Sequence, residues 1–277
     1  MKILENKTEL QEFLKEIPQK GKKIGLIPTM GSIHQGHLSL IKTCQELGYF
    51  SLVTIFVNPT QFNDLNDFEM YPRNIDNDKK SLESVNTDLL FFPATKDLYP
   101  GGIKSEKTVH EYRNILCDIN RPDHFDGVTT VVNSLFDLIK PDHVFFGEKD
   151  FQQLKIIQKM LENNRSSIIM HPCPSIRMSN GISYSSRYKK FSISEEKIFN
   201  NVANTLMRSI SDLRKNFNIK IIKDLKKKLI EGGLKKIDYL QIKNEINLLP
   251  TFEKNNSRLF VAFYIGKIRI IDNFILY

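Results

Sequence analysis

The chain has 277 residues, and its 40% hydrophobic and 26% charged residues are typical of a globular protein with one large domain or two smaller ones. No apolar run approaches the roughly 18 residues of a membrane helix, and the first residues lack the apolar core of a secretory signal. Cys44, Cys117 and Cys173 are too few and too far apart for a disulfide framework or a zinc pattern. We therefore expect a cytoplasmic protein with no membrane partner.

The net charge of +8 raises the question of nucleic-acid binding. Much of the excess lies at residues 220–236, where lysines alternate with apolar residues at helical spacing. A solvated helix face explains this pattern, so we expect no nucleic-acid partner, although a basic RNA-binding protein stays open as an alternative. A positive field would also favour a polyanionic substrate such as ATP.

Short apolar runs alternate with helical patterns through the first two thirds of the chain. Helices are predicted at 7–16, 37–47, 75–85, 128–139 and 150–161, and strands at 24–28, 50–57, 88–93, 142–147 and 166–171. The polar stretch 63–77 is predicted as a long loop that ends in the helix at 75–85, and 121–127 as an irregular loop. The Pro/Gly-bounded segment 99–102 interrupts the pattern. This alternation indicates an α/β fold with a parallel sheet of five or six strands and helices on both faces.

The pattern changes after residue 176. Helices are predicted at 194–213 and 221–231, followed by a strand at 239–243 and a hairpin around Gly266. We therefore expect two domains, 1–176 and a smaller α+β domain at 177–277. The apolar run 50–57 is one candidate for an interface between subunits.

Residues 30–37, Met-Gly-Ser-Ile-His-Gln-Gly-His, lie between the first predicted strand and its helix. Imidazoles at His34 and His37 can meet charge that develops at a phosphate, and glycines at Gly31 and Gly36 let phosphate approach the backbone. The alternative is a helix start in which both histidines are satisfied structurally. The glycines and the strand before them favour a nucleotide site.

Two further segments follow predicted strands. Asn58 and Gln61 come after the second strand and offer uncharged hydrogen bonds for a small hydroxyl- or carboxylate-bearing substrate, although a simple proline turn explains the spacing equally well. Lys149 comes after the fourth strand and could meet phosphate charge. Asp150 and Gln153 could instead form a capping box, which needs no ligand.

The segment 183–187, Ser-Tyr-Ser-Ser-Arg, lies at the expected domain boundary and could wrap a triphosphate, or could be a plain polar linker. No histidine, cysteine or acidic cluster has the spacing of metal ligands. We leave the metal ligands unassigned: Mg²⁺ would ride on the ATP phosphates, with Asp76 and Asp78 as possible helpers.

Together these segments resemble the pantothenate synthetase (pantoate–β-alanine ligase) family over residues 24–272. The His-x-Gly-His motif alone is shared with nucleotidylyltransferases, which stay an alternative, whereas the segments around Gln61 and Gln153 are more specific. The matching segments are 28–37, 56–62, 71–73, 99–102, 124–128, 146–153, 185–187, 238–240 and 266–272.

The resemblance implies a Rossmann-like ATP domain, a C-terminal lid domain and a homodimer. It implies a ligase that joins pantoate to β-alanine through pantoyl adenylate, with ATP as co-substrate and AMP and pyrophosphate as products. Implied catalytic residues are His37, His34, Lys149 and Arg187. Implied ATP-binding residues are Met30, Gly31, Ser32, Ile33, His34, Gln35, Gly36, His37, Gly147, Glu148, Lys149, Asp150, Ile176, Tyr184, Ser185, Ser186 and Arg187. Gln61 (for pantoate and β-alanine), Gln153 (for pantoate) and Asn58 would bind substrate.

The chain departs from the family pattern in two places. The family usually has two acids and no tyrosines in the segment before the lid, where this chain has Met178, Asn180, Tyr184 and Tyr188. Asp126 stands where many members have arginine. Both changes leave the histidines of residues 30–37 in place, so we expect activity.

Overall fold

The structure is a computed structural model that describes residues 1–19, 21–106 and 109–277. Backbone contacts divide the chain into two compact units. The first unit comprises Met1–Asn114, Arg121–Glu148 and Gln153–Pro174, and the second comprises Ile115–Asn120, Lys149–Gln152 and Ser175–Tyr277. Two short segments that interrupt the first unit in sequence therefore belong to the second.

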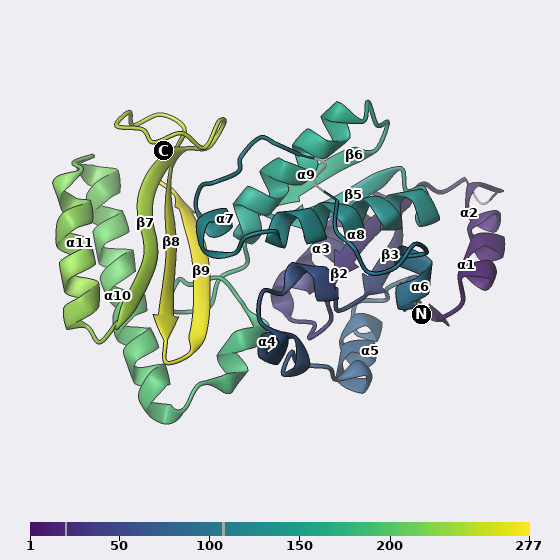
Figure 1. Cartoon of the computed structure of the whole chain (residues 1–277), viewed down its shortest axis with the longest axis horizontal. Helices are drawn as coiled ribbons and strands as arrows, with labels where there is room; N and C mark the ends of the chain where they lie inside the picture. Colours follow the sequence, from purple (N-terminus) through teal and green to yellow (C-terminus); the bar gives the residue numbers. More distant parts are fainter. Residues whose placement is uncertain (20, 107–108) are drawn as a thin grey trace. The chain divides into compact units, whose positions relative to one another are not determined.

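The first unit is built on a six-stranded sheet with the order β1-β4-β3-β2-β5-β6. Figure 1 labels β2, β3, β5 and β6 of this sheet. Every neighbouring pair of strands is parallel, as the alternation of strands and helices predicts. The strands are β1 (Lys2–Leu4), β2 (Ile24–Thr29), β3 (Phe50–Ile55), β4 (Leu89–Phe91), β5 (His143–Gly147) and β6 (Ile169–Cys173).

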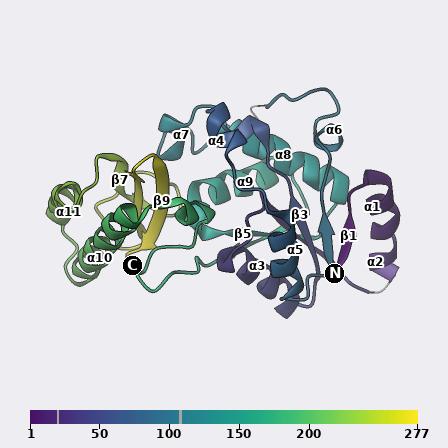
Figure 2. The ribbon, with the colours of Figure 1, turned by 90° about the horizontal axis from the view of Figure 1, so that it is seen from below.

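Helices cover both faces of this sheet. Figure 2 shows α3 (Gln35–Glu46) and α5 (Ile75–Glu83) below it and α8 (His124–Ile139) and α9 (Phe151–Asn163) above it. The first unit also contains α1 (Lys7–Leu14), α2 (Glu16–Gln19), α4 (Leu65–Glu69), α6 (Thr95–Leu98) and the 3-10 turn η1 (Pro59–Gln61). The 3-10 turn η2 (Glu148–Asp150) and the short helix α7 (Cys117–Asn120) complete the elements before residue 174.

Strand register explains why both faces are apolar. Ile27 pairs with Val53, and Val53 pairs with Leu90, so these three side chains share one face. They are fully buried and belong to the same apolar cluster as Ile41 of α3 and Leu82 of α5. The residues just before them in each strand are also buried, which is the continuous apolar pattern of a parallel sheet covered on both sides.

The second unit is an α+β layer, as expected from its sequence. Its antiparallel sheet has the order β7-β8-β9, made of β7 (Lys236–Asn244), β8 (Ser257–Ile265) and β9 (Ile268–Ile275). Helices α10 (Ile193–Lys215) and α11 (Lys220–Glu231) bury their apolar sides in one cluster with alternate residues of β8, including Leu259, Val261 and Phe263. The 3-10 turn η3 (Ser186–Lys190) precedes α10.

Four sequence expectations need correction. The stretch 63–77 was predicted as a loop before a helix at 75, but it contains helix α4, which Asp64 caps by accepting from the Asn66 N–H. The edge strand β1 was not predicted, because three residues are too few to show a period. Helix α8 begins at His124, four residues before its predicted start. Asp126 and Gly127 suggested a loop, but a Cβ at position 127 would lie 2.5 Å from the Thr60 carbonyl oxygen, so the glycine allows a close approach of η1 to the helix.

The last correction concerns the run 50–57, which was one candidate for an interface between subunits. It forms β3, which lies between β2 and β4, so both of its edges are paired and it offers no free edge to another subunit.

In the part of the chain that the structure describes, no helix is both long enough and apolar enough to cross a membrane.

A pair of histidines lies at the amino-terminal end of the first unit's sheet. His143 Nδ1 lies 2.9 Å from His171 Nε2, and Tyr49 stacks on His143 with ring centroids 3.9 Å apart. Burial lowers the pKa of both imidazoles below the ordinary value of 6.5. The folded state therefore favours the neutral rings.

We expect this pair to make the first unit sensitive to acid. Because the folded pKa values are lowered, the stabilisation is present above about pH 6.5 and is lost as the pH falls through the lowered values. The measurement is urea unfolding between pH 8 and pH 5 for the native chain and for His171→Gln, whose amide nitrogen can replace Nε2 but does not titrate. The native chain should lose more stability than the variant, and equal losses would contradict the prediction.

Candidate active site

The candidate residues of the first unit follow three neighbouring strands. Strands β3, β2 and β5 are adjacent and parallel, so their carboxyl ends meet at one edge of the sheet. Residues 30–37 follow β2, Asn58 and Gln61 follow β3, and Gly147 ends β5. The chain winds from β2 toward β3 on one side and from β5 toward β6 on the other, which makes this edge the switch point where open α/β sheets bind ligands.

The two histidines of residues 30–37 lie together at the start of α3. His34 is the N-cap residue, and its Nδ1 accepts a hydrogen bond from the Gly36 N–H at 3.1 Å. An accepting Nδ1 carries no proton, so the proton of the neutral ring is on Nε2. The ring of His37 stacks on His34 with centroids 4.1 Å apart. Sequence reasoning proposed a satisfied helix start as the alternative to a nucleotide site, and His34 performs that capping through Nδ1.

A buried carboxylate holds the loop before α3. Asp78, near the start of α5, accepts hydrogen bonds from the N–H groups of Ser32 at 2.8 Å and Ile33 at 2.7 Å. Only 4% of Asp78 is exposed, so these are charge-assisted bonds in a site with little water. Thr29 Oγ1 accepts the Gly31 N–H at 3.1 Å and donates to the Thr54 carbonyl at 2.8 Å. The loop is therefore tied both to α5 and to β3.

These hydrogen bonds decide which backbone N–H groups of the loop are available to bind a phosphate. Gly31 and Ser32 have φ values of +80° and +52°, a left-handed turn that directs successive N–H groups to one side. That side is occupied by Asp78, so the Ser32 and Ile33 N–H groups are engaged within the protein. Asp78 thus has a structural role, in contrast to the metal helper suggested from sequence. Among residues 1–19, 21–106 and 109–277, no group of three or more His, Cys, Asp or Glu side chains could hold a metal ion.

Gln61 is held from both its backbone and its side chain. Its carbonyl oxygen lies 2.8 Å from His124 Nδ1 and accepts from Arg121 at 3.1 Å, and its Oε1 accepts from Asn58 Nδ2 at 3.2 Å. Its Nε2 lies 2.8 Å from Met30 Sδ. The structure thus brings together Met30, from the candidate nucleotide segment, and Gln61, from the candidate substrate segment.

Asp126, which departs from the family pattern, forms a salt bridge with Arg113. Its Oδ1 lies 2.6 Å from Arg113 Nη1, and both side chains are less than one tenth exposed. A buried carboxylate without a cation would be costly, so Arg113 explains how aspartate is accommodated at this position.

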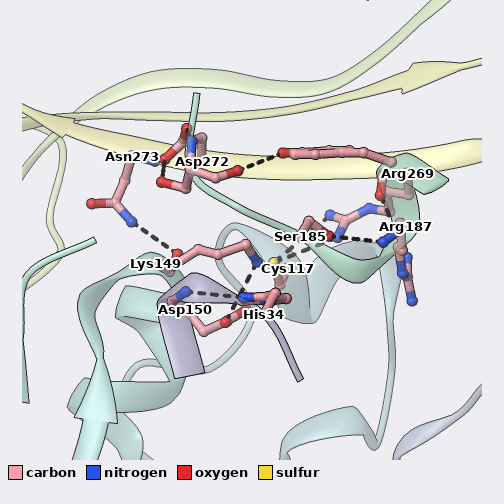
Figure 3. A network of polar contacts seen from close by, with 12 residues as sticks. His34, Cys117, Lys149, Asp150, Ser185, Arg187, Arg269, Asp272 and Asn273 are labelled. Atoms are coloured by element: carbon pink, nitrogen blue, oxygen red, sulfur yellow. Dashed lines mark hydrogen bonds and ion pairs between the residues drawn. The ribbon is translucent and has the colours of Figure 1, made fainter. Parts of the chain in front are cut away.

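Further candidate residues belong to the second unit: Lys149, Asp150, Ile176, Tyr184, Ser185, Ser186 and Arg187. The carbonyl of Lys149 accepts from Asn273 Nδ2 on β9 at 3.0 Å (Figure 3). Lys149 Nζ lies 3.5 Å from Asp150 Oδ2. The Arg187 N–H donates to Ser185 Oγ at 3.3 Å, and its guanidinium donates to the Arg269 carbonyl at 3.4 Å. Each cationic candidate is therefore placed by a contact with β9.

Asp272 on β9 anchors the segment that leads to Arg187. This buried carboxylate accepts from the Ser183 N–H at 2.8 Å and the Ser183 hydroxyl at 2.7 Å, and it pairs with Arg177 at 3.1 Å. Tyr184 N–H donates to the Ile176 carbonyl at 3.1 Å. Residues 176–184 are thus a folded turn fixed to the sheet, which a plain polar linker would not be.

The atypical residues of this segment have structural explanations. Met178 and Tyr188 pack against the apolar cluster of the second unit, and the Tyr188 hydroxyl donates to the Ser183 carbonyl at 2.9 Å. Burial raises the pKa of Tyr188, so its phenol stays protonated. Asn180 Oδ1 accepts the Ile182 N–H at 3.2 Å, a turn that an aspartate would also form.

The adjacent glutamines after β5 differ in their surroundings. Gln152 is buried, accepts from the Cys117 N–H at 2.9 Å and donates to the Ile115 carbonyl at 3.0 Å. Gln153 is half-buried in the first turn of α9. Gln152 is therefore committed to the fold, and Gln153 is the better substrate candidate of the two.

Comparison with known proteins decides the family. The family model described as pantoate-beta-alanine ligase matches residues 2–275. The chain belongs to the pantoate–β-alanine ligase family. The pantothenate synthetase of Sulfurihydrogenibium sp. (strain YO3AOP1) is 39% identical, with 99% of each chain covered, and that of Fervidobacterium nodosum is 36% identical, with 100% of this chain and 99% of the relative covered.

Two solved structures of this family resemble the whole chain. Pantothenate synthetase from Thermus thermophilus has a TM-score of 0.91 at 30% identity, with 100% of both chains covered. Pantoate-beta-alanine ligase from Francisella tularensis, complexed with beta-gamma ATP and beta-alanine, has a TM-score of 0.86 at 35% identity, with 100% of this chain and 98% of that chain covered. The Rossmann-like parallel sheet with a smaller C-terminal α+β part is therefore the fold of this pantoate–β-alanine ligase family member.

The sequence indicated no structural role for two residues that shape the site, Asp78 and Asp272. Asp78 carried one usable signal, because it lies four residues before Leu82 and so shares the buried face of its helix. A carboxylate on an apolar helix face needs donors, and the glycine-containing loop supplies them. Nothing local marked Asp272, whose partners lie about 90 positions earlier.

We expect Asp78→Asn to loosen the loop. The amide can accept only one of the two N–H groups and turns its own NH₂ toward the other, which should cost about 1–3 kcal/mol of unfolding free energy and weaken ATP binding. Urea unfolding and calorimetric titration with ATP measure the two effects. Glu83→Gln is the matched control, since Glu83 lies on the same helix but is exposed. Identical behaviour of the two variants would contradict the role given to Asp78.

Proposed function

We propose that the chain joins pantoate to β-alanine at the expense of ATP, giving pantothenate, AMP and pyrophosphate. The observation that carries the proposal is the edge of the sheet formed by β3, β2 and β5, in a member of the pantoate–β-alanine ligase family. There, the stacked imidazoles of His34 and His37 lie at the start of α3, which follows β2, and Gln61, whose amide Asn58 holds, follows the neighbouring strand β3. The first suits a nucleotide phosphate, and the second suits a small hydroxy acid.

In the first proposed step, a pantoate carboxylate oxygen attacks the α-phosphorus of ATP. The bond from the α-phosphorus to the bridging oxygen breaks, and pyrophosphate leaves with that electron pair. The product is pantoyl adenylate, a mixed anhydride. Negative charge grows on the α-phosphate oxygens, and the Nε2–H group of His34 together with His37 would stabilise it.

In the second proposed step, the β-alanine amine attacks the acyl carbon of the adenylate. AMP leaves with the bridging oxygen, and the amine loses a proton to give the amide of pantothenate. No protein nucleophile is required in either step. Holding both reactants on fixed elements lowers the entropic barrier of each reaction.

The proposed roles extend to both units. In the first unit, residues 30–37, Gly147 and Glu148 bind ATP, while Gln61 and Gln153 bind pantoate and Gln61 also contacts β-alanine. In the second unit, Lys149 and Arg187 meet phosphate charge, and Asp150, Ile176 and 184–186 complete the nucleotide site. Residues 1–176 would act as the ATP- and pantoate-binding domain and 177–277 as the lid that keeps water from the adenylate.

Mg²⁺ would be held by the ATP phosphates and would supply positive charge to the leaving pyrophosphate. The homodimer and the cytoplasmic location expected from the sequence stay predictions.

The products separate this function from its alternatives. With ATP and pantoate alone we expect pyrophosphate exchange but little AMP, and with β-alanine added we expect AMP and pantothenate in equal amounts. A nucleotidylyltransferase would give an adenylylated product and no β-alanine-dependent AMP. An RNA-binding protein would show a steep salt dependence of RNA affinity and no turnover. Chromatography of products from the three mixtures decides between them.

His37→Ala should lose the first step. Removing one group that stabilises the phosphate charge should slow pantoate-dependent exchange between ATP and labelled pyrophosphate by about 100-fold to 1000-fold. His110→Ala is the control, because His110 is an exposed histidine of the same unit. Thermal unfolding checks that both variants fold. Near-normal exchange in folded His37→Ala would show that the mechanism is wrong.

A further inference from the structure

Asn58 has no hydrogen-bonding capacity left for a substrate. Its Nδ2 donates to the Gly127 carbonyl at 3.0 Å and to Gln61 Oε1 at 3.2 Å. Its Oδ1 accepts from the Tyr99 hydroxyl at 2.5 Å and from the Thr60 hydroxyl at 3.1 Å. An asparagine side chain has two donor hydrogens and two acceptor lone pairs, and each of them faces a partner here at a residue that is 1% exposed. The Tyr99 and Thr60 hydroxyls also lie 2.9 Å from each other, so they share their two protons between this contact and Asn58 Oδ1.

The polarity of this network is fixed by the backbone. A carbonyl oxygen can only accept, so the Asn58 atom that faces Gly127 must be the nitrogen. The same nitrogen faces Gln61, so the Gln61 atom that it meets must be the oxygen. The hydroxyls of Tyr99 and Thr60 support this orientation by donating to the other end of Asn58. A reversed Asn58 would set its oxygen against the Gly127 carbonyl.

Gln61 is therefore oriented as well. With Oε1 directed at Asn58, the group on its other side is the Nε2 donor. That nitrogen contacts Met30 Sδ, a weak acceptor that a substrate oxygen can replace. A carboxylate only accepts hydrogen bonds, so an outward N–H attracts a hydroxy acid, whereas an outward carbonyl would repel it.

We propose that Tyr99, acting through Asn58, is a positioning residue that holds the Gln61 amide with its N–H directed at the hydroxy acid. The proposal rests on the proposed function, in which Gln61 binds pantoate. It assigns Asn58, expected from the sequence to bind substrate, to orienting Gln61. Burial raises the pKa of Tyr99, so the phenol keeps the proton that it donates.

We call the chain of contacts from Tyr99 through Asn58 to Gln61 the relay. A double-mutant cycle tests it, with Tyr99→Phe, Gln61→Ala and the combined variant. Tyr99→Phe removes one donor to Asn58 Oδ1, so the Asn58 side chain, and through it the Gln61 amide, is held less firmly in this orientation. We expect the KM for pantoate to rise roughly threefold to tenfold, with the KM for ATP unchanged. In the Gln61→Ala background the same substitution should have no further effect on the pantoate KM, because Tyr99 acts only through Gln61.

Tyr49→Phe is the matched control, since Tyr49 stacks on His143 at the amino-terminal end of the sheet and takes no part in this network. It should leave the KM for pantoate unchanged. Thermal unfolding is measured for each variant. If Tyr99→Phe does not fold, Thr60→Val removes the second donor to Asn58 and should give a smaller rise of the same kind.

The outcomes separate the relay from the function. An unchanged pantoate KM in folded Tyr99→Phe overturns the relay, and so does an equal effect with and without Gln61, which would mean that Tyr99 acts independently. A native chain that forms no pantoate-dependent AMP with β-alanine overturns the proposed function and the relay with it. A rise confined to pantoate and dependent on Gln61 supports both.

Discussion

The two hydrogen bonds from the Ser32 and Ile33 N–H groups to the buried Asp78 carboxylate are the constraint on which the candidate site depends. They fix a left-handed turn that would otherwise leave two donors unsatisfied beside an apolar core. The turn sets where α3 begins, and the start of α3 sets where His34 and His37 stack. Burying a carboxylate costs desolvation free energy. Here each Asp78 oxygen accepts a backbone N–H, which offsets that cost and fixes the loop before α3.

The same principle recurs elsewhere in the molecule. In each case a buried, hydrogen-bonded polar group holds a segment that could contact substrate: Asp78 holds the loop before α3, Asn58 holds Gln61, and Asp272 holds the turn before Arg187. Each partly satisfied version of these networks would be less stable than an apolar core. Their residues therefore determine the geometry of the site while leaving the chemistry to others. Few side chains of the candidate site would contact substrate, and a larger number of buried polar groups hold them in place.

Local pattern was enough to predict the long elements and the positions of the candidate residues. Buried parallel strands gave continuous apolar runs, and Gly266 marked the turn of the β8–β9 hairpin. The sequence pattern gave a wrong or incomplete prediction where a contact with a distant part of the chain determines the local structure. Gly127 suggested a loop because the close approach of Thr60 cannot be read locally, and Asp78 meets donors 45 and 46 positions away. The orientation of an amide such as Gln61 depends on a backbone carbonyl in another element, which no sequence period reveals.

Oxygen transfer tests most directly whether the pantoate carboxylate attacks the α-phosphorus of ATP. Pantoate labelled with ¹⁸O in its carboxylate is converted with ATP and β-alanine, and the products are measured by mass spectrometry. Attack at the α-phosphorus predicts one labelled oxygen in AMP and none in pyrophosphate. Label in inorganic phosphate with formation of ADP, or unlabelled AMP, would contradict the account.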